Sequence, residues 1–137
     1  MQKRYYLDTC IWIDYFENRS DRFRPLGEWA FRALAKIIEE EGIILFSNLN
    51  EKEFRNYYSK EQMAQMLTLV PLALLKLVKT REKQFEEAKL LAGILRIPTN
   101  DAIHAILARD NSAILITRDK HFMLIKGVDI KLPEDLL

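Results

Sequence analysis

Four acidic residues stand where carboxylates could take part in chemistry. Asp8 and Asp119 follow short β-prone runs, Glu53 lies on the helix expected after the second of the expected strands, and Asp101 opens another expected helix. Carboxylates gathered in one place repel one another, and some take up protons unless a cation neutralises them. Their types and positions therefore favour a shared cation site.

The chemistry of such a site is metal-assisted hydrolysis. Hard divalent cations such as Mg²⁺ prefer carboxylate and water oxygens. A metal ion lowers the pKa of a bound water, which becomes a nucleophile near neutral pH, and it also stabilises the leaving oxygen of a cleaved phosphodiester. The chain contains no GxSxG nucleophile elbow and no glycine-rich phosphate loop. Its two histidines and single cysteine do not have the spacing of a zinc site.

Strands and helices are expected to alternate along the chain. Short apolar runs bounded by polar residues predict strands at 4–7, 42–46, 74–78, 113–117 and, at the periphery, 128–132. Helical spacing of apolar residues predicts helices over 29–38 and 81–95 and from about 60 onward, and either Thr99 or Asn100 can cap a further one. Pro71 leaves the end of the segment 60–74 ambiguous. We predict an α/β fold of three layers, α/β/α, with a central, mostly parallel sheet.

The topology of such a sheet would bring distant acids together. The first strand is usually central, and right-handed crossovers let the strand at 113–117 lie beside it. Ligands bind outside the carboxyl ends of the strands, at the point where the strand order reverses. We therefore expect Asp8 and Asp119 to face the same crevice.

Composition restricts the class of protein. A length of 137 residues without a linker predicts a single domain over 1–137, and 49% apolar with 30% charged residues argues against disorder. The 21 basic and 20 acidic residues give a net charge of +1, which provides no global attraction to nucleic acid but allows a local one. The N-terminus lacks the apolar core of a signal peptide, and the apolar-rich stretch 66–78 is too short and too interrupted to span a membrane. We expect a soluble, cytoplasmic protein.

Four segments of the sequence together resemble the PIN-domain family and, within it, the small ribonuclease toxins of VapC type. They are YYLDTCIWIDYF around Asp8, LFSNLNEKEF around Glu53, IPTNDAIHAILA around Asp101 and AILITRDKHF around Asp119. Each segment is a weak motif alone, but four in the family's order form a specific pattern. The resemblance implies a PIN-like fold and a metal-dependent endoribonuclease, whose four acids bind Mg²⁺ or Mn²⁺ and carry the catalysis.

Small hydroxyl residues accompany the acids in this resemblance. Thr117 looks like the family's hydroxyl residue at the end of the strand before the last acid, and Thr9 and Ser47 fall where family members often have such residues. Glu53 is preferred to Glu51 because its spacing from Ser47 fits the family pattern.

Basic residues and partners complete the expectation. Arg118 lies between Thr117 and Asp119, so we predict it at the rim of the crevice in contact with RNA phosphate, together with Lys120. The resemblance also implies a homodimer and an antitoxin partner. Trp12, Tyr15 and Phe16 are expected in the core or at a dimer surface. Exposed aromatic residues at 12–16 and the apolar stretch 67–77 would suit the dimer surface.

Each acid also has a structural interpretation. Asp8 could form a turn, Asp119 could cap a short helix, and Asp101 could interact with a helix dipole. Glu53 three residues after Asn50 fits a variant of the capping box.

The two histidines are expected to be structural. His104 should be packed against the sheet or hydrogen-bonded, and His121 should lie closer to the crevice without touching substrate.

Three classes of function stay open. The leading one is an endoribonuclease toxin, with an RNA-processing nuclease outside a toxin–antitoxin system as its variant. The second is a non-catalytic PIN-like scaffold, which would be expected to lack one or more of the acids. The third is a phospho-accepting receiver domain, which needs an acid pair near the first strand, whereas Leu7 precedes Asp8 here.

Overall fold

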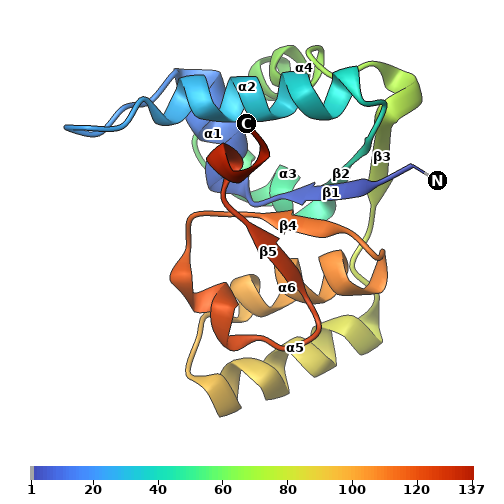
Figure 1. Ribbon diagram of the computed structural model, residues 1–137. Helices are drawn as coiled ribbons and strands as arrows, with labels where there is room; N and C mark the ends of the chain where they lie inside the picture. Colours follow the sequence, from blue (N-terminus) through green and yellow to red (C-terminus); the bar gives the residue numbers. More distant parts are fainter. Residues whose placement is uncertain (1) are drawn as a thin grey trace.

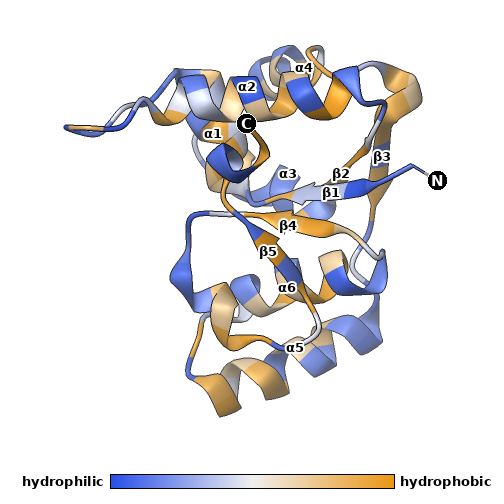
Figure 2. Cartoon of the chain, in the orientation of Figure 1, coloured by the Kyte–Doolittle hydropathy of each residue, from blue (hydrophilic) through white to orange (hydrophobic). Residues whose placement is uncertain are grey.

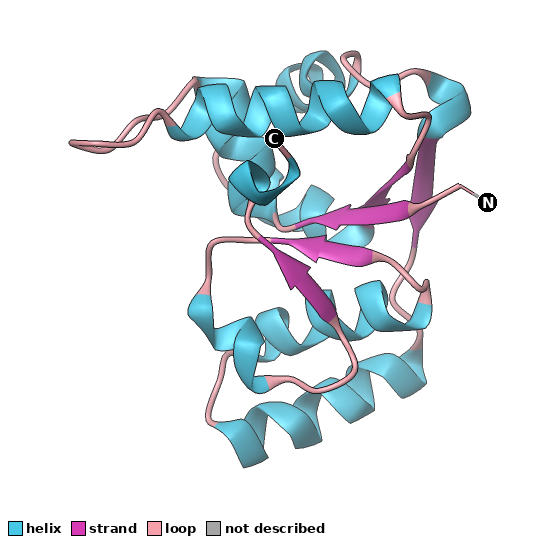
Figure 3. Cartoon of the chain, in the orientation of Figure 1, coloured by secondary structure: helices cyan, strands magenta, loops and turns pink. Residues whose placement is uncertain are grey.

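The computed structural model describes residues 2–137, within which a sheet of five strands has the order β3-β2-β1-β4-β5. The strands are β1 (Arg4–Leu7), β2 (Ile43–Ser47), β3 (Leu75–Val78), β4 (Ile114–Ile116) and β5 (Asp129–Lys131). Each neighbouring pair of these strands is parallel. The predicted parallel sheet is confirmed, with the first strand in the middle and the last at an edge (Figure 3).

Helices cover both faces of the sheet, which confirms the three-layer architecture (Figure 1). They are α1 (Thr9–Glu17), α2 (Leu26–Glu39), α3 (Asn48–Arg55), α4 (Lys60–Leu67), α5 (Glu82–Leu95) and α6 (Thr99–Asp110). Helices α1, α2 and α4 lie on one face and α5 and α6 on the other. Short 3₁₀ helices are η1 (Leu72–Leu74), η2 (Lys120–Leu124) and η3 (Pro133–Leu136). Among the described residues, none of the helices has the length and apolar character needed to cross a bilayer.

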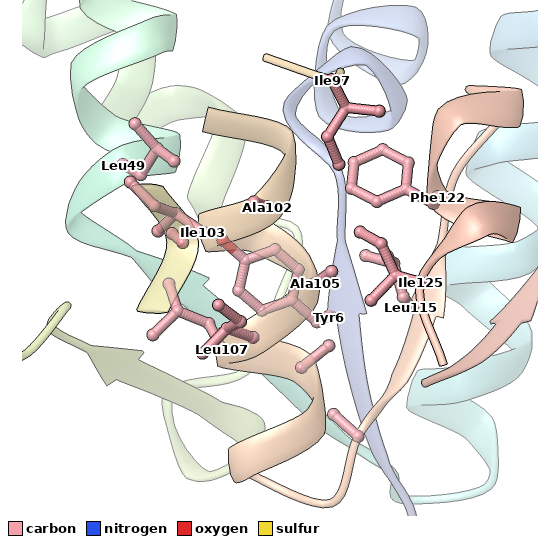
Figure 4. Close-up of a cluster of buried hydrophobic side chains, with 14 of the residues drawn as sticks. Tyr6, Leu49, Ile97, Ala102, Ile103, Ala105, Leu107, Leu115, Phe122 and Ile125 are labelled. Atoms are coloured by element: carbon pink, nitrogen blue, oxygen red, sulfur yellow. The ribbon is translucent and has the colours of Figure 1, made fainter. Parts of the chain in front are cut away.

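The central strand contributes to a core on each face. Tyr5 and Leu7 belong to the cluster under α1 and α2, whereas Tyr6 between them belongs to the cluster against α5 and α6. Figure 4 shows the ring of Tyr6 beside Ala105 of α6 and Leu115 of β4. Burial on both faces explains why β2 and β4 are near-continuous apolar runs, as the orange ribbon of β4 shows (Figure 2).

One helix start differs from the sequence expectation, and one helix end that the sequence left open is now defined. Helix α6 is preceded by Pro98 at its N-cap, and neither Thr99 nor Asn100 caps it, because both residues already lie within the helix. The helical pattern that begins at Lys60 ends at Leu67. A turn and η1 then lead the chain into β3.

The aromatic residues expected to be exposed on α1 instead pack inward. Trp12 is fully buried and meets Phe46 of β2 edge-on, with 5.6 Å between the ring centroids. Phe16 contacts Phe54 of α3 at the same centroid separation of 5.6 Å. The expectation of exposed aromatics at 12–16 is wrong for these rings, because they fill the layer between α1, β2 and α3.

Candidate active site

The acids that follow β1 and β4 meet at the carboxyl edge of the sheet. The backbone N–H of Asp8 donates to the carbonyl of Ile116 at 3.0 Å, which continues the β1–β4 ladder one step beyond β1. Asp8 is also the N-cap residue of α1. From β1 the order runs to β2 and β3 on one side and to β4 and β5 on the other, so Asp8 stands where the strand order reverses.

Thr117 connects Asp8 to Asp119. Its hydroxyl donates to Oδ2 of Asp8 at 2.8 Å and accepts the backbone N–H of Asp119 at 3.0 Å. The thiol of Cys10 also donates to Oδ2 of Asp8, at 3.3 Å. These buried contacts fix the orientation of the Asp8 carboxylate and leave its Oδ1 toward the site.

Glu53, from the middle of α3, reaches the same edge from the side of β2. Its Oε1 accepts the hydroxyl of Thr9 at 2.7 Å and lies 2.7 Å from Nε2 of His104, whereas Oε2 has the longer contact with Nδ2 of Asn100 at 3.4 Å. Burial raises the pKa of Glu53, but these three hydrogen bonds and the charge of His104 outweigh burial and leave the pKa below its ordinary value. Glu53 is therefore held as a carboxylate.

Glu51, the alternative at this position, is exposed on the same helix. The contacts of Glu53 with α1 and α6 support the choice of Glu53.

Asp101 and Asp119 form the other half of the site with His121. Nδ1 of His121 lies 3.3 Å from Oδ2 of Asp101 and 3.2 Å from Oδ1 of Asp119, and one ligand atom from each of the three residues lies within 4.8 Å of the others. Asp119 also caps η2, since its Oδ1 accepts the backbone N–H of His121 at 2.9 Å. The structural interpretation of Asp119 as a cap is thus confirmed, and it coexists with the cluster.

The electrostatics of Asp101 link the two halves. Burial raises the pKa of Asp101, and the charges of Asp119 and Asp8 raise it further, while the hydrogen bond with His121 opposes them. On the other side, Nε2 of His104 lies 4.0 Å from Oδ1 of Asp8 as well as next to Glu53. The four predicted acids therefore converge on one edge of the sheet.

The donor set suits a hard divalent cation. Carboxylate oxygens dominate, as Mg²⁺ and Mn²⁺ prefer, and His121 adds one imidazole nitrogen to the half formed by Asp101 and Asp119. The pKa of Asp101 is raised first by burial and then by the charges of Asp119 and Asp8, and a bound cation would oppose each of these effects.

Ser47 lies behind the acids, at the start of α3. It caps α3 in a capping box with Asn50, and its hydroxyl lies 2.7 Å from that of Tyr6, not against an acid. The capping-box interpretation of Glu53 is wrong, because Ser47 and Asn50 form the box and leave the Glu53 side chain free to reach the site.

Both histidines contact the acids, which the sequence did not predict. His104 is buried and hydrogen-bonded as predicted, but its partner is Glu53. The signal was its place three residues after Asp101, on a neighbouring part of the same helix surface. His121 lies close to the crevice as predicted, and its ring contacts both Asp101 and Asp119.

The two basic residues predicted to contact RNA have different surroundings. The guanidinium of Arg118 lies 2.8 Å from Glu134 and 3.7 Å from Asp14, and its carbon is 5.6 Å from the centre of the Trp29 ring. Its side chain is only 13% exposed, so contact with RNA requires these ion pairs to open first. Lys120, by contrast, is exposed next to Asp119.

Comparisons with known proteins identify the family of the chain. The sequence matches the PIN domain family over residues 5–127, and the chain therefore belongs to that family. PIN domains are a family of nucleases. No curated protein matches the sequence.

Three solved structures have a similar fold. VapBC2 from Rickettsia felis, bound to a DNA fragment from its promoter, is 19% identical, with a TM-score of 0.68 over 94% of this chain and 98% of that one. A toxin–antitoxin complex from Klebsiella pneumoniae is 22% identical, with a TM-score of 0.64 over 94% and 97%. FitAcB from Neisseria gonorrhoeae is 18% identical, with a TM-score of 0.63 over 93% and 96%.

Proposed function

We propose that this PIN domain is a metal-dependent endoribonuclease and the toxin of a toxin–antitoxin pair. The observation that carries the proposal is the convergence of Asp8, Glu53, Asp101 and Asp119 at the point where the strand order reverses. The alternative of a non-catalytic scaffold leaves these four crowded carboxylates without a role.

The four acids would hold one or two Mg²⁺ or Mn²⁺ ions. Such an ion, when bound, supplies an activated water and stabilises charge on the cleaved phosphodiester. Thr117 donates a hydrogen bond to Asp8, and Thr9 and His104 contact Glu53. These contacts hold the carboxylates in place before RNA arrives, so that little reorganisation accompanies the reaction.

Phosphate recognition is assigned first to Lys120, because it is exposed beside Asp119. Arg118 is a second contact only in a state in which its pairs with Glu134 and Asp14 have opened. RNA is the proposed substrate, and a nuclease that cuts cellular RNA would act in the cytoplasm.

The proposed partners follow from the fold and from one exposed surface. The similar structures include toxin–antitoxin complexes, which supports an antitoxin as the protein partner. Leu72 and Leu77 of the stretch 67–77 are 89% and 70% exposed, and they support a homodimer with this stretch at its surface.

The first test is cleavage of a labelled single-stranded RNA by the purified chain with Mg²⁺ or Mn²⁺. Asp8→Asn and Asp101→Asn each remove a negative charge from the site, so we expect cleavage to fall by ~100-fold or more with the fold retained. Glu51→Gln, on the exposed side of α3, is the matched control and should cleave normally.

Normal cleavage by folded Asp8→Asn protein contradicts the mechanism. Absence of both cleavage and Mn²⁺ binding in the wild-type protein favours the scaffold.

A further inference from the structure

A closed ring of hydrogen-bonded side chains lies directly behind the acidic site. Each member contacts the next in the order Asn50, Thr9, Glu53, His104, Tyr6, Ser47 and back to Asn50. All of them except Glu53 are buried. Buried polar groups cost free energy unless all are paired, so a ring of this kind in an otherwise apolar core requires an explanation.

Asn50 determines which atoms donate and which accept in the hydrogen bonds of one half of the ring. Its Oδ1 accepts the backbone N–H of Ser47 at 2.9 Å, which identifies Nδ2 as the donor to Leu7 and Thr9. Since Thr9 accepts from Asn50, its own hydroxyl proton is directed at Glu53.

The carboxylate of Glu53 determines the donors and acceptors in the other half of the ring. An ionised Glu53 only accepts, so Nε2 of His104 must carry a proton. With neutral His104, Nδ1 accepts from Tyr6, which accepts from Ser47. With protonated His104, the two hydroxyls reverse and Ser47 donates to Oδ1 of Asn50 at 3.1 Å. The donor facing Glu53 is the same in both states.

The two carboxylate oxygens of Glu53 therefore differ in their hydrogen bonding. Oε1 is saturated by Thr9 and His104, both at 2.7 Å, whereas within residues 2–137 the only hydrogen bond of Oε2 is the 3.4 Å contact with Asn100. We propose that His104, supported by Tyr6, is a positioning residue: it holds Oε1 so that Oε2 is presented to the metal ion. The proposal rests on the function proposed above and adds an element of the metal site that lies outside the four acids.

A pair of variants separates positioning from simple packing. His104→Gln keeps an N–H donor at the reach of Nε2 and loses the contact with Tyr6. His104→Asn keeps a polar group at the place of Nδ1 and loses the donor to Glu53. If His104 serves only as a hydrogen-bond partner of Tyr6, His104→Asn should be the milder change. If His104 positions Glu53, His104→Gln should be the milder change.

The measurement is Mn²⁺ affinity by isothermal titration calorimetry, with the unfolding free energy of the metal-free protein measured by urea. We expect His104→Asn to weaken Mn²⁺ binding by ~10–100-fold, as for other partners that orient metal ligands, and His104→Gln to retain most of the affinity. Tyr6→Phe, which keeps the ring and removes the hydroxyl, should weaken binding less than His104→Asn. Ile106→Val on α6, buried outside the ring, is the control for stability alone and should bind normally.

The outcomes distinguish the two proposals. If the wild-type protein binds Mn²⁺ and folded His104→Asn binds it equally well, the positioning role is overturned while the nuclease survives. The same holds if His104→Gln is as weak as His104→Asn. If His104→Asn does not fold, loss of affinity in Tyr6→Phe supports positioning, and normal affinity in Tyr6→Phe overturns it. If the wild-type protein binds no Mn²⁺, the proposed function fails and the positioning role falls with it.

Discussion

At the residue scale, Glu53 and Asp101 have pKa values displaced in opposite directions. Hydrogen bonds from His104, Thr9 and Asn100 overcome the effect of burial at Glu53, whereas burial and the charges of neighbouring acids dominate at Asp101. The protein's own hydrogen bonds stabilise the ionised form of Glu53. The ionised form of Asp101 is disfavoured, and a cation would stabilise it.

The displaced pKa of Asp101 predicts a gain in stability on its removal. A raised pKa in the folded state means that ionisation of Asp101 opposes folding, and this cost appears as the pH rises above the ordinary pKa of an aspartate. Asp101→Asn should therefore raise the unfolding free energy of the metal-free protein at neutral pH, with a difference that vanishes in acid. Urea unfolding between about pH 3 and pH 7 measures it, because the lower limit must lie below the ordinary pKa of an aspartate.

Added Mn²⁺ should reverse this order, because the wild-type protein gains more binding free energy. A metal-free Asp101→Asn protein that is less stable than wild type at neutral pH would contradict this account of the site.

At the element scale, the sequence predicts where most strands and helices lie, while contacts between elements decide the site. The run Arg4–Leu7 is found as expected, because burial on both faces demands an apolar run that Asp8 ends. The place of Asp119 near Asp8 follows from the strand order. The spacing of His104 from Asp101 indicates that His104 lies near the site, but its contact with Glu53 was not predictable, since it depends on how α6 lies relative to α3.

Helix α3 provides an element-scale test because its capping residue Asn50 also joins three elements. Asn50→Ala leaves the Ser47 N–H, the Leu7 carbonyl and Thr9 without this partner in a buried place, so we expect a loss of ~2–4 kcal/mol of unfolding free energy. Gln62→Ala in α4 is the matched control.

Gln62 has the same capping-box role as Asn50 but is exposed, so its loss should cost about 0.5 kcal/mol. Urea unfolding compares the two variants. Equal losses would show that the junction at Asn50 contributes no more than an exposed cap.

At the scale of the whole molecule, the near-zero net charge does not mean that charge is evenly spread. The net charge of +1 hides a concentration of acids at one edge of the sheet, with Lys120 exposed at its rim. The parallel topology produces this concentration, since the carboxyl ends of β1 and β4 lie side by side. A cation is the simplest way for one fold to tolerate it, which makes the bound metal the central claim.

The most direct test of that claim is anomalous diffraction from a crystal of the wild-type protein soaked in Mn²⁺. We expect a strong manganese peak in contact with carboxylate oxygens of Asp8, Asp101 and Asp119, with Oε2 of Glu53 facing it directly or through water. A fully soaked crystal whose manganese lies elsewhere, with this edge of the sheet free of metal, would contradict the account.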